Sequence, residues 1–262
     1  MTWRMNMLDR TGIINKLREV LEPLPYIYAL WLEGADAVGM VDKYSDIDFW
    51  VDVEDEYETQ AIEAVENALS ELTEIDYKHI MRHDHPKIRQ QIYHLASTSE
   101  YLMIDFCWQL HSRLNDENIA YFENDGIEAA KVIFDKDNII QYKPLDLSEF
   151  TEWNKARLKE AKYRRTQHIR AGKYVSRGQY LEAYAYYNKY VLEPLIDLLR
   201  LIYIPAYANY YLIHISQHIP QVQREKLEYF ARINSLDDIA AKAPQAGKWF
   251  DELIERLGGN DG

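Results

Sequence analysis

The strongest constraint on the fold is the stretch "DIDFWVDV" at residues 46–53, in which polar and apolar side chains alternate. Successive side chains of a β-strand point to opposite faces of the sheet. The apolar face of this strand would hold Ile47, Phe49, Val51 and Val53, and the other face Asp46, Asp48, Trp50 and Asp52. The sequence therefore predicts a strand with one apolar face and one acidic face.

A second stretch, "YLMIDFCWQ" at residues 101–109, repeats this arrangement. Its apolar face would hold Leu102, Ile104, Phe106 and Trp108, and its other face Tyr101, Met103, Asp105 and Cys107. An aspartate in the middle of such a strand is costly to bury without a partner. If the two strands lie together in one sheet, Asp46, Asp48 and Asp105 converge.

The remaining patterns divide the chain near residue 148. Before it, the sequence predicts helices at 8–22 and 55–72, and strands at 26–33, 46–53, twice within 91–110, and at 131–138. After it, apolar residues recur every three or four positions from 181 to 202, with an interruption at Pro194, and further helices are expected at 207–219, 222–232 and 235–257. We expect an α+β chain: a mixed-sheet domain at 1–147, then a helical bundle at 148–262.

Charge and composition limit the classes of function. The 262 residues carry a net charge of −13, which argues against broad binding to long nucleic acids. It is compatible with a cationic small substrate. Residues 155–177 nevertheless hold nine basic side chains against one acid, which suggests either a local anionic partner or a solvated helix face. No apolar run approaches the ~20 residues of a membrane helix, and a single cysteine rules out an internal disulfide, so we expect a cytoplasmic protein.

The acidic residues need more than a motif to be meaningful. With 43 acids among 262 residues, chance alone gives about seven acid-x-acid triplets. Placement is the stronger argument, because two charges 4 Å apart repel by about 4 kcal/mol at an effective dielectric of 20. Three carboxylates at one place therefore take up a proton or a cation, and Mg²⁺ with a bound triphosphate suits their hard oxygens. The ordinary alternative is a set of acids at a polar sheet edge.

The same residues resemble the nucleotidyltransferase superfamily of the DNA polymerase β type. Its signature is Gly-Ser, a spacer, Asp-x-Asp, and a third acid on a later strand; the counterparts here are Gly34-Ala35, "KYSDIDFWV" at 43–51, and Asp105. The resemblance implies that Asp46 and Asp48 hold Mg²⁺, with Asp105 as third ligand or general base. It also implies that Gly34, Ala35 and Ser45 seat the nucleotide phosphates. Ala35 departs from the family serine, so backbone amides or Ser45 would take over, or the enzyme would be weakened.

The second half resembles the helical bundle of bacterial aminoglycoside nucleotidyltransferases of the streptomycin/spectinomycin kind and of uncharacterised relatives. The resemblance covers 177–205 and "HISQHIP" at 214–220. It implies basic contacts to the triphosphate, for which the candidates are Lys155, Lys159, Lys162 and Arg200, and acids for the acceptor, for which they are Glu182 and Glu193. The other expectation for Arg200 is an ion pair with Asp197 or Glu193.

Together these features predict an enzyme that transfers a nucleoside monophosphate, AMP from ATP above all, to a hydroxyl of a small molecule. An aminoglycoside-like antibiotic is the acceptor that the resemblance implies, which would make the protein a resistance enzyme. The alternatives are a catalytically weakened nucleotide-binding regulator or toxin–antitoxin component, and a modifier of a protein or RNA partner. The sequence is compatible with a monomer or a homodimer.

Overall fold

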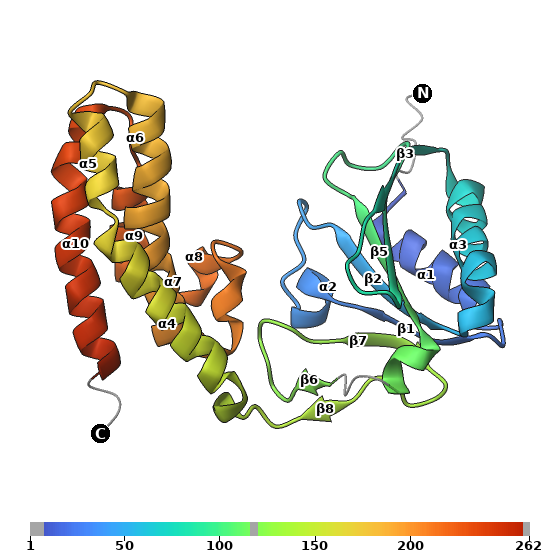
Figure 1. The fold of residues 1–262 in the computed structure, drawn as a ribbon. Coiled ribbons are helices and arrows are strands. Elements are labelled where there is room, and N and C mark those ends of the chain that lie inside the picture. The colour runs from blue at the N-terminus through green and yellow to red at the C-terminus, as the bar shows by residue number, and fades with distance from the viewer. Residues whose placement is uncertain (1–7, 116–119, 259–262) are drawn as a thin grey trace. The chain divides into compact units, whose positions relative to one another are not determined.

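The chain divides into two compact units after Leu145, two residues before the predicted boundary. The computed structural model describes residues 8–115 and 120–258. The first unit holds a sheet with flanking helices, and the second consists of helices (Figure 1). The predicted α+β class is confirmed.

The first unit is built on a six-stranded sheet in the order β3-β4-β5-β2-β1-β7. The strands are β1 (Ile27–Leu32), β2 (Ile47–Val53), β3 (Ile75–Met81), β4 (Ile88–Leu95), β5 (Ile104–Leu110) and β7 (Lys131–Asp135). The central strands β2 and β5 are parallel, and the other neighbouring pairs are antiparallel. The two alternating stretches of the sequence are therefore adjacent strands at the middle of the sheet.

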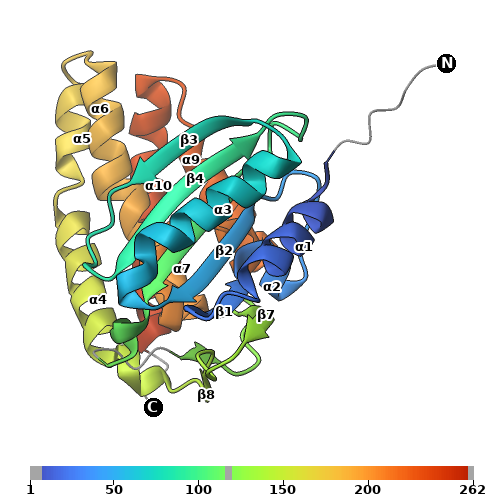
Figure 2. The ribbon, with the colours of Figure 1, turned by 90° about the vertical axis from the view of Figure 1, so that its right-hand side faces the viewer.

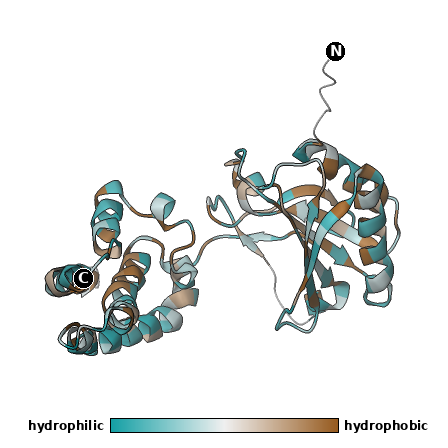
Figure 3. Cartoon of the chain, turned by 90° about the horizontal axis from the view of Figure 1, so that it is seen from above, coloured by the Kyte–Doolittle hydropathy of each residue, from teal (hydrophilic) through white to brown (hydrophobic). Residues whose placement is uncertain are grey.

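Helices α1 (Arg10–Leu21) and α3 (Glu58–Leu72) cover one face of this sheet (Figure 2). The Asp9 side chain starts α1 by accepting a hydrogen bond from the backbone of Gly12 at 2.8 Å. Beneath the helices lie Phe49 and Phe106, whose stacked rings are 5.1 Å apart. Figure 3 shows apolar residues, in brown, along the strands of this unit. The apolar faces predicted for the two strands thus form the core of the unit.

The opposite face of the sheet is polar and aromatic. Trp31 and Trp50 stack there at 5.9 Å, and Trp31 donates a hydrogen bond to Tyr121 at 2.7 Å. The remaining short elements of this unit are α2 (Gly34–Val38), β6 (Tyr121–Phe122), β8 (Tyr142–Lys143) and the 3₁₀ turns at 55–57 and 111–115. The polar face of the sheet carries Asp48 and Asp105.

The second unit has its own core. Its helices are α4 (Thr151–Thr166), α5 (Ile169–Val175), α6 (Tyr180–Tyr187), α7 (Glu193–Tyr203), α8 (Ile215–His218), α9 (Gln221–Ala231) and α10 (Leu236–Gly258). Seven consecutive residues of α7, from Leu195 to Leu201, are buried. Pro194 stands in the first turn of α7, and a π-helical turn at 188–192 joins this helix to α6. The proline therefore begins a new helix, which resolves the predicted kink or split.

Two segments differ from the prediction. Strand β3 has no counterpart among the predicted strands, and its side chains are mostly exposed. A helix was predicted at 207–219, but the chain forms a 3₁₀ segment at 205–210 and only one turn of α-helix, α8. His214 just before α8 has a positive φ of 52°, which interrupts a continuous helix. No helix among residues 8–115 and 120–258 is long and apolar enough to cross a membrane.

Candidate active site

Asp48 and Asp105 face each other at the centre of the sheet. They are register partners on the parallel strands β2 and β5, and neighbouring strands lie about 4.8 Å apart. Their neighbours Phe49 and Phe106 are fully buried on the helix-covered face, so both carboxylates project from the other face. Strand alternation and pairing therefore bring together two acids that are 57 residues apart in the sequence.

Asp46 lies just before β2, on a segment that is anchored by Arg10. The guanidinium of Arg10 donates to the backbone carbonyls of Ser45 at 2.5 Å and of Asp46 at 2.6 Å. It also forms a largely buried ion pair with Asp36 of α2. Arg10 thus fixes the segment that carries Asp46. The sequence held no signal for this role, since the contact joins residues 36 positions apart.

The backbone of Gly34 lies against the Asp48 side chain. Its φ of +56° lies in the left-handed region, and a Cβ atom at this position would overlap the Asp48 carboxylate. The adjacent Glu33 amide donates to the Asp48 carbonyl at 3.0 Å. Glycine accepts the positive φ and has no Cβ atom to overlap the carboxylate, so the backbone of Gly34 stays uncovered beside Asp48.

The side chains next to Gly34 offer no free hydroxyl. Ala35 lies on α2 and has no hydroxyl group. The Ser45 hydroxyl contacts Asp42: its oxygen accepts from the Asp42 amide at 2.9 Å and donates to the Asp42 carboxylate at 3.1 Å. Ser45 therefore closes a turn, and the Gly34–Ala35 segment offers its backbone amides to a phosphate.

The electrostatics of the site reflect crowded negative charge. Burial, followed by repulsion from the nearby carboxylates of Asp46, Asp105, Glu33 and Asp36 in that order, raises the pKa of Asp48 to about 7. Burial also raises the pKa of Asp105, although Gln90 opposes this by donating to both carboxylate oxygens at 2.8 Å. A bound cation would remove the repulsion that keeps a proton on Asp48 near neutral pH.

Two further acids adjoin the site, and sequence reasoning missed both. Burial raises the pKa of Glu33, while a hydrogen bond from the Tyr121 hydroxyl lowers it. Burial, followed by repulsion from Glu33 and Asp125, raises the pKa of Glu128 to about 7. The signal that was overlooked is a glutamate at the end of a buried strand, in "WLEG".

The donor set suits a hard divalent cation. In the ranges 8–115 and 120–258, no three histidine, cysteine or acidic side chains stand arranged to hold a metal ion. Mg²⁺, however, is usually bound by only one or two carboxylates and completes its shell with water and substrate phosphates. Asp48 and Asp105, with Asp46 as the adjacent acid, fit that requirement in number and chemistry.

The basic candidates of the second unit lie on α4. Lys155 forms an exposed ion pair with Glu152 at 2.8 Å. Lys155 and Lys162 line one cavity of about 420 Å³ that also includes Leu158 and Leu201, and Lys159 does not line it. A role for these lysines toward a triphosphate stays a prediction.

Arg200 has different partners from those expected. It is fully buried, donates to the carbonyls of Tyr211 at 2.8 Å and of Ile213, and lies 2.9 Å from the His218 Nδ1 atom. The expected ion pair with Asp197 or Glu193 is wrong, because those acids pair with other arginines. Arg157 bonds to Asp197 at 2.8 Å and Arg164 to Glu193 at 2.7 Å. We therefore leave Arg200 out of the proposed site.

The two acids predicted to bind the acceptor lie in the second unit. Glu193 opens α7 and is held in the ion pair with Arg164. Glu182 lies in the first turn of α6, where its side chain is exposed. Contact of either acid with an acceptor stays a prediction.

Comparison with known proteins gave matches among solved structures alone. No family model and no curated protein matches the chain. The chain is similar to an aminoglycoside 6-adenyltransferase from Bacillus subtilis, at 15% identity and a TM-score of 0.34 over 95% of this chain and 92% of that one. It is also similar to a spectinomycin adenyltransferase from Enterococcus faecialis crystallised with ATP and spectinomycin, at 11% identity and a TM-score of 0.32 over 94% and 100%. JHP933 from Helicobacter pylori matches at 13% identity and a TM-score of 0.29 over the full length of both chains. At this level of likeness, the function has to be argued from the acidic site itself.

Proposed function

We propose that the protein is a Mg²⁺-dependent nucleotidyltransferase that transfers a nucleoside monophosphate, AMP from ATP above all, to a hydroxyl of a small acceptor. The observation that carries the proposal is the in-register pair Asp48 and Asp105 beside the open backbone of Gly34. Burial and the neighbouring carboxylates together raise the pKa of Asp48 to about 7, which suits a bound cation, and the glycine backbone suits a phosphate.

In the proposed reaction the three aspartates bind the metal ion or accept a proton. Asp46 and Asp48 would hold Mg²⁺, which when bound neutralises phosphate charge. Asp105, whose pKa is raised by burial, is a third ligand or accepts the proton of the acceptor hydroxyl. The acceptor oxygen then bonds to the α-phosphorus, the bond from that phosphorus to the bridging oxygen breaks, and pyrophosphate leaves.

The acceptor that fits best is small and cationic. Negative charge is concentrated around the site by five acids, Asp46, Asp48, Asp105, Glu33 and Glu128. Such a potential attracts a cationic hydroxyl compound and repels a long nucleic acid. An aminoglycoside-like antibiotic satisfies this chemistry and is the first acceptor to test.

Ala35 favours a second candidate function. With no hydroxyl at Ala35 and the Ser45 hydroxyl bound to Asp42, phosphate binding relies on backbone amides. A regulator that binds a nucleotide without turnover would have the same features. It predicts tight ATP binding and no pyrophosphate release.

The test is pyrophosphate release from each of the four NTPs with Mg²⁺, against a panel of aminoglycosides and lincosamides. We expect acceptor-dependent release that falls by about 10³-fold or more in Asp48→Asn, since transition-state charge stabilisation is lost. Asp84→Asn is the matched control, because Asp84 is exposed in the loop between β3 and β4. Equal activity of Asp48→Asn and the wild type would refute the assignment, and ATP binding without release would favour the regulator.

A further inference from the structure

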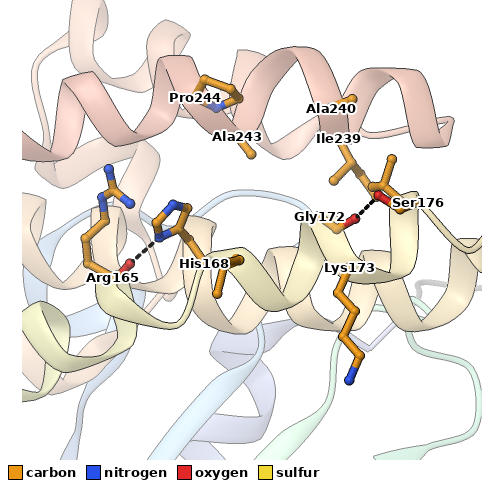
Figure 4. Close-up of a pocket in the computed structure, with 11 residues that line it drawn as sticks. Arg165, His168, Gly172, Lys173, Ser176, Ile239, Ala240, Ala243 and Pro244 are labelled. Atoms are coloured by element: carbon orange, nitrogen blue, oxygen red, sulfur yellow. Dashed lines mark hydrogen bonds between the residues drawn. The ribbon is translucent and has the colours of Figure 1, made fainter.

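The second unit contains a solvent-open cavity of about 590 Å³ between α5 and α10, with Ile169 exposed at its edge, that has no part in the proposed reaction. Most of its wall is apolar, formed by Ile169, Val175, Ile239, Ala240, Ala243 and Pro244. Its polar lining comes from Arg165, His168, Lys173 and Ser176 (Figure 4). A volume of this size is typical of pockets that hold a small organic molecule.

Arg165 gives this cavity a charged end. Its side chain points toward α10, and its guanidinium carbon lies 5.9 Å from the centre of the Phe250 ring (Figure 4). Its Nε atom is buried without a hydrogen-bond partner, and no acid pairs with it in the part of the chain that the structure describes. A buried donor without a partner costs about 1–3 kcal/mol, so an anion at this point would satisfy it.

Helix α10 is shaped to receive that guanidinium. A Cβ atom on Gly247 would overlap the end of Arg165, so a larger residue there would make the guanidinium move. Glycine inside a helix costs about 1 kcal/mol relative to alanine. Three residues earlier, Pro244 cannot donate to the Ala240 carbonyl, and both residues line the cavity. Two helix-weakening residues thus stand on the face of α10 that borders the cavity and Arg165.

The other polar groups divide into two kinds. The His168 ring points toward α10 beside Arg165, with its Nδ1 atom 2.8 Å from the Arg165 carbonyl oxygen, which leaves Nε2 for a ligand. Lys173, although it lines the cavity, points away from α10 (Figure 4). The side-chain groups directed toward α10 at this cavity are therefore one guanidinium and one imidazole.

We propose that this cavity binds a small carboxylate with an apolar body, the carboxylate at Arg165 and the body against Ile169, Ile239 and Ala243. A guanidinium matches a carboxylate through two parallel hydrogen bonds. A phosphate dianion is generally bound by more than one cationic side chain, whereas Arg165 is the cationic side chain that points toward α10 here. The proposal concerns the helical unit alone and does not depend on the nucleotidyltransferase reaction.

The test is calorimetric titration of the full chain with decanoate. We expect binding of one decanoate per chain, and binding at least about tenfold weaker for Arg165→Gln, the equivalent of losing one charged hydrogen-bond partner. Lys173→Gln is the matched control: it removes one charge from the same cavity lining, yet should stay within about twofold of the wild type. Ala243→Phe, which keeps Arg165 but fills the cavity, should also abolish binding.

Two further ligands separate the two parts of the proposal. The alcohol 1-decanol has the apolar body without the charge, and acetate has the charge without the body, so both should bind at least about tenfold more weakly than decanoate. Circular dichroism verifies that each variant is folded. If Arg165→Gln does not fold, Ala243→Phe takes its place as the test of the cavity. No binding of decanoate to the wild type, or equal losses in Arg165→Gln and Lys173→Gln, would overturn the proposal.

Discussion

At the scale of single residues, Gly34 shows how closely the backbone and the acids fit. Its positive φ and its contact with Asp48 are separate requirements, and Gly39 shares only the first. Gly39 has a φ of +72°, but a Cβ atom there would meet nothing within 4 Å. A comparison of substitutions at Gly34 and Gly39 therefore separates the free-energy cost of the backbone conformation from that of steric overlap.

We expect Gly34→Ala to remove activity and to lower the free energy of unfolding by more than Gly39→Ala does. Alanine in the left-handed region costs about 1–2 kcal/mol, so the free energy of unfolding falls by about this amount in both variants. Gly34→Ala must in addition displace the Asp48 carboxylate. Urea unfolding measures the stabilities and pyrophosphate release the activities. Equal effects of the two substitutions would show that the contact with Asp48 is unimportant.

The raised pKa of Asp48 makes stability depend on pH. An unfolded aspartate has a pKa of about 3.9, whereas that of Asp48 is about 7, so the folded state binds its proton more tightly. The stability that this proton contributes is present at pH 4 and is lost as the pH rises through 7. Without a metal ion, Asp48→Asn should therefore stabilise the fold at pH 8 by on the order of 1–3 kcal/mol, and much less at pH 5.

Thermal melting with and without Mg²⁺ provides the control for this prediction. Mg²⁺ should raise the melting temperature of the wild type at pH 8, because it neutralises the same charge that the substitution removes. It should leave Asp48→Asn almost unchanged. A melting temperature of Asp48→Asn that is lower than that of the wild type at pH 8 would contradict the assigned electrostatics.

At the scale of elements, the two central strands could be predicted from the sequence because alternation is a local pattern. The pairing of β2 with β5 was only a condition in the sequence analysis, because alternation within a strand does not say which strands are neighbours. Arg10 could not be predicted, since its partners lie on a distant segment. Arg200 was misjudged for the same reason: helical spacing suggested Asp197, but backbone carbonyls from a later loop bind it.

The anchoring of the Asp46 segment by α1 leads to a prediction about Arg10. Arg10→Met should destabilise the fold by about 2–4 kcal/mol, because it leaves the buried Asp36 carboxylate with the half-exposed Lys131 ammonium 3.9 Å away in place of the Arg10 guanidinium. Lys16→Met on the same helix is the control, since its ion pair with Glu71 is more exposed and contributes about 1 kcal/mol or less. Chemical denaturation measures both. Similar values for the two variants would show that Arg10 does not hold this segment.

At the scale of the whole molecule, the two units have separate hydrophobic cores. The first is centred on β2 and β5, and the second on α7. The core clusters of the two units share no residue. Each unit therefore has the means to be stable by its own packing.

Leu199→Ala tests this separation. Leu199 is fully buried on α7, and its truncation should cost about 2–5 kcal/mol. Hydrogen exchange should show lost protection in α7 and unchanged protection in β2. A loss of protection of equal size in β2 would mean that the two units unfold together.

The crowding of acids around Asp48 also has a consequence for how such a chain can change over generations. The fold would be more stable at neutral pH with a neutral residue in that place, and only a task that needs the charge favours keeping it. A laboratory selection that rewards heat resistance without turnover should recover substitutions of Asp48 early. The selected variants would be more thermostable but would lack the proposed nucleotidyltransferase activity.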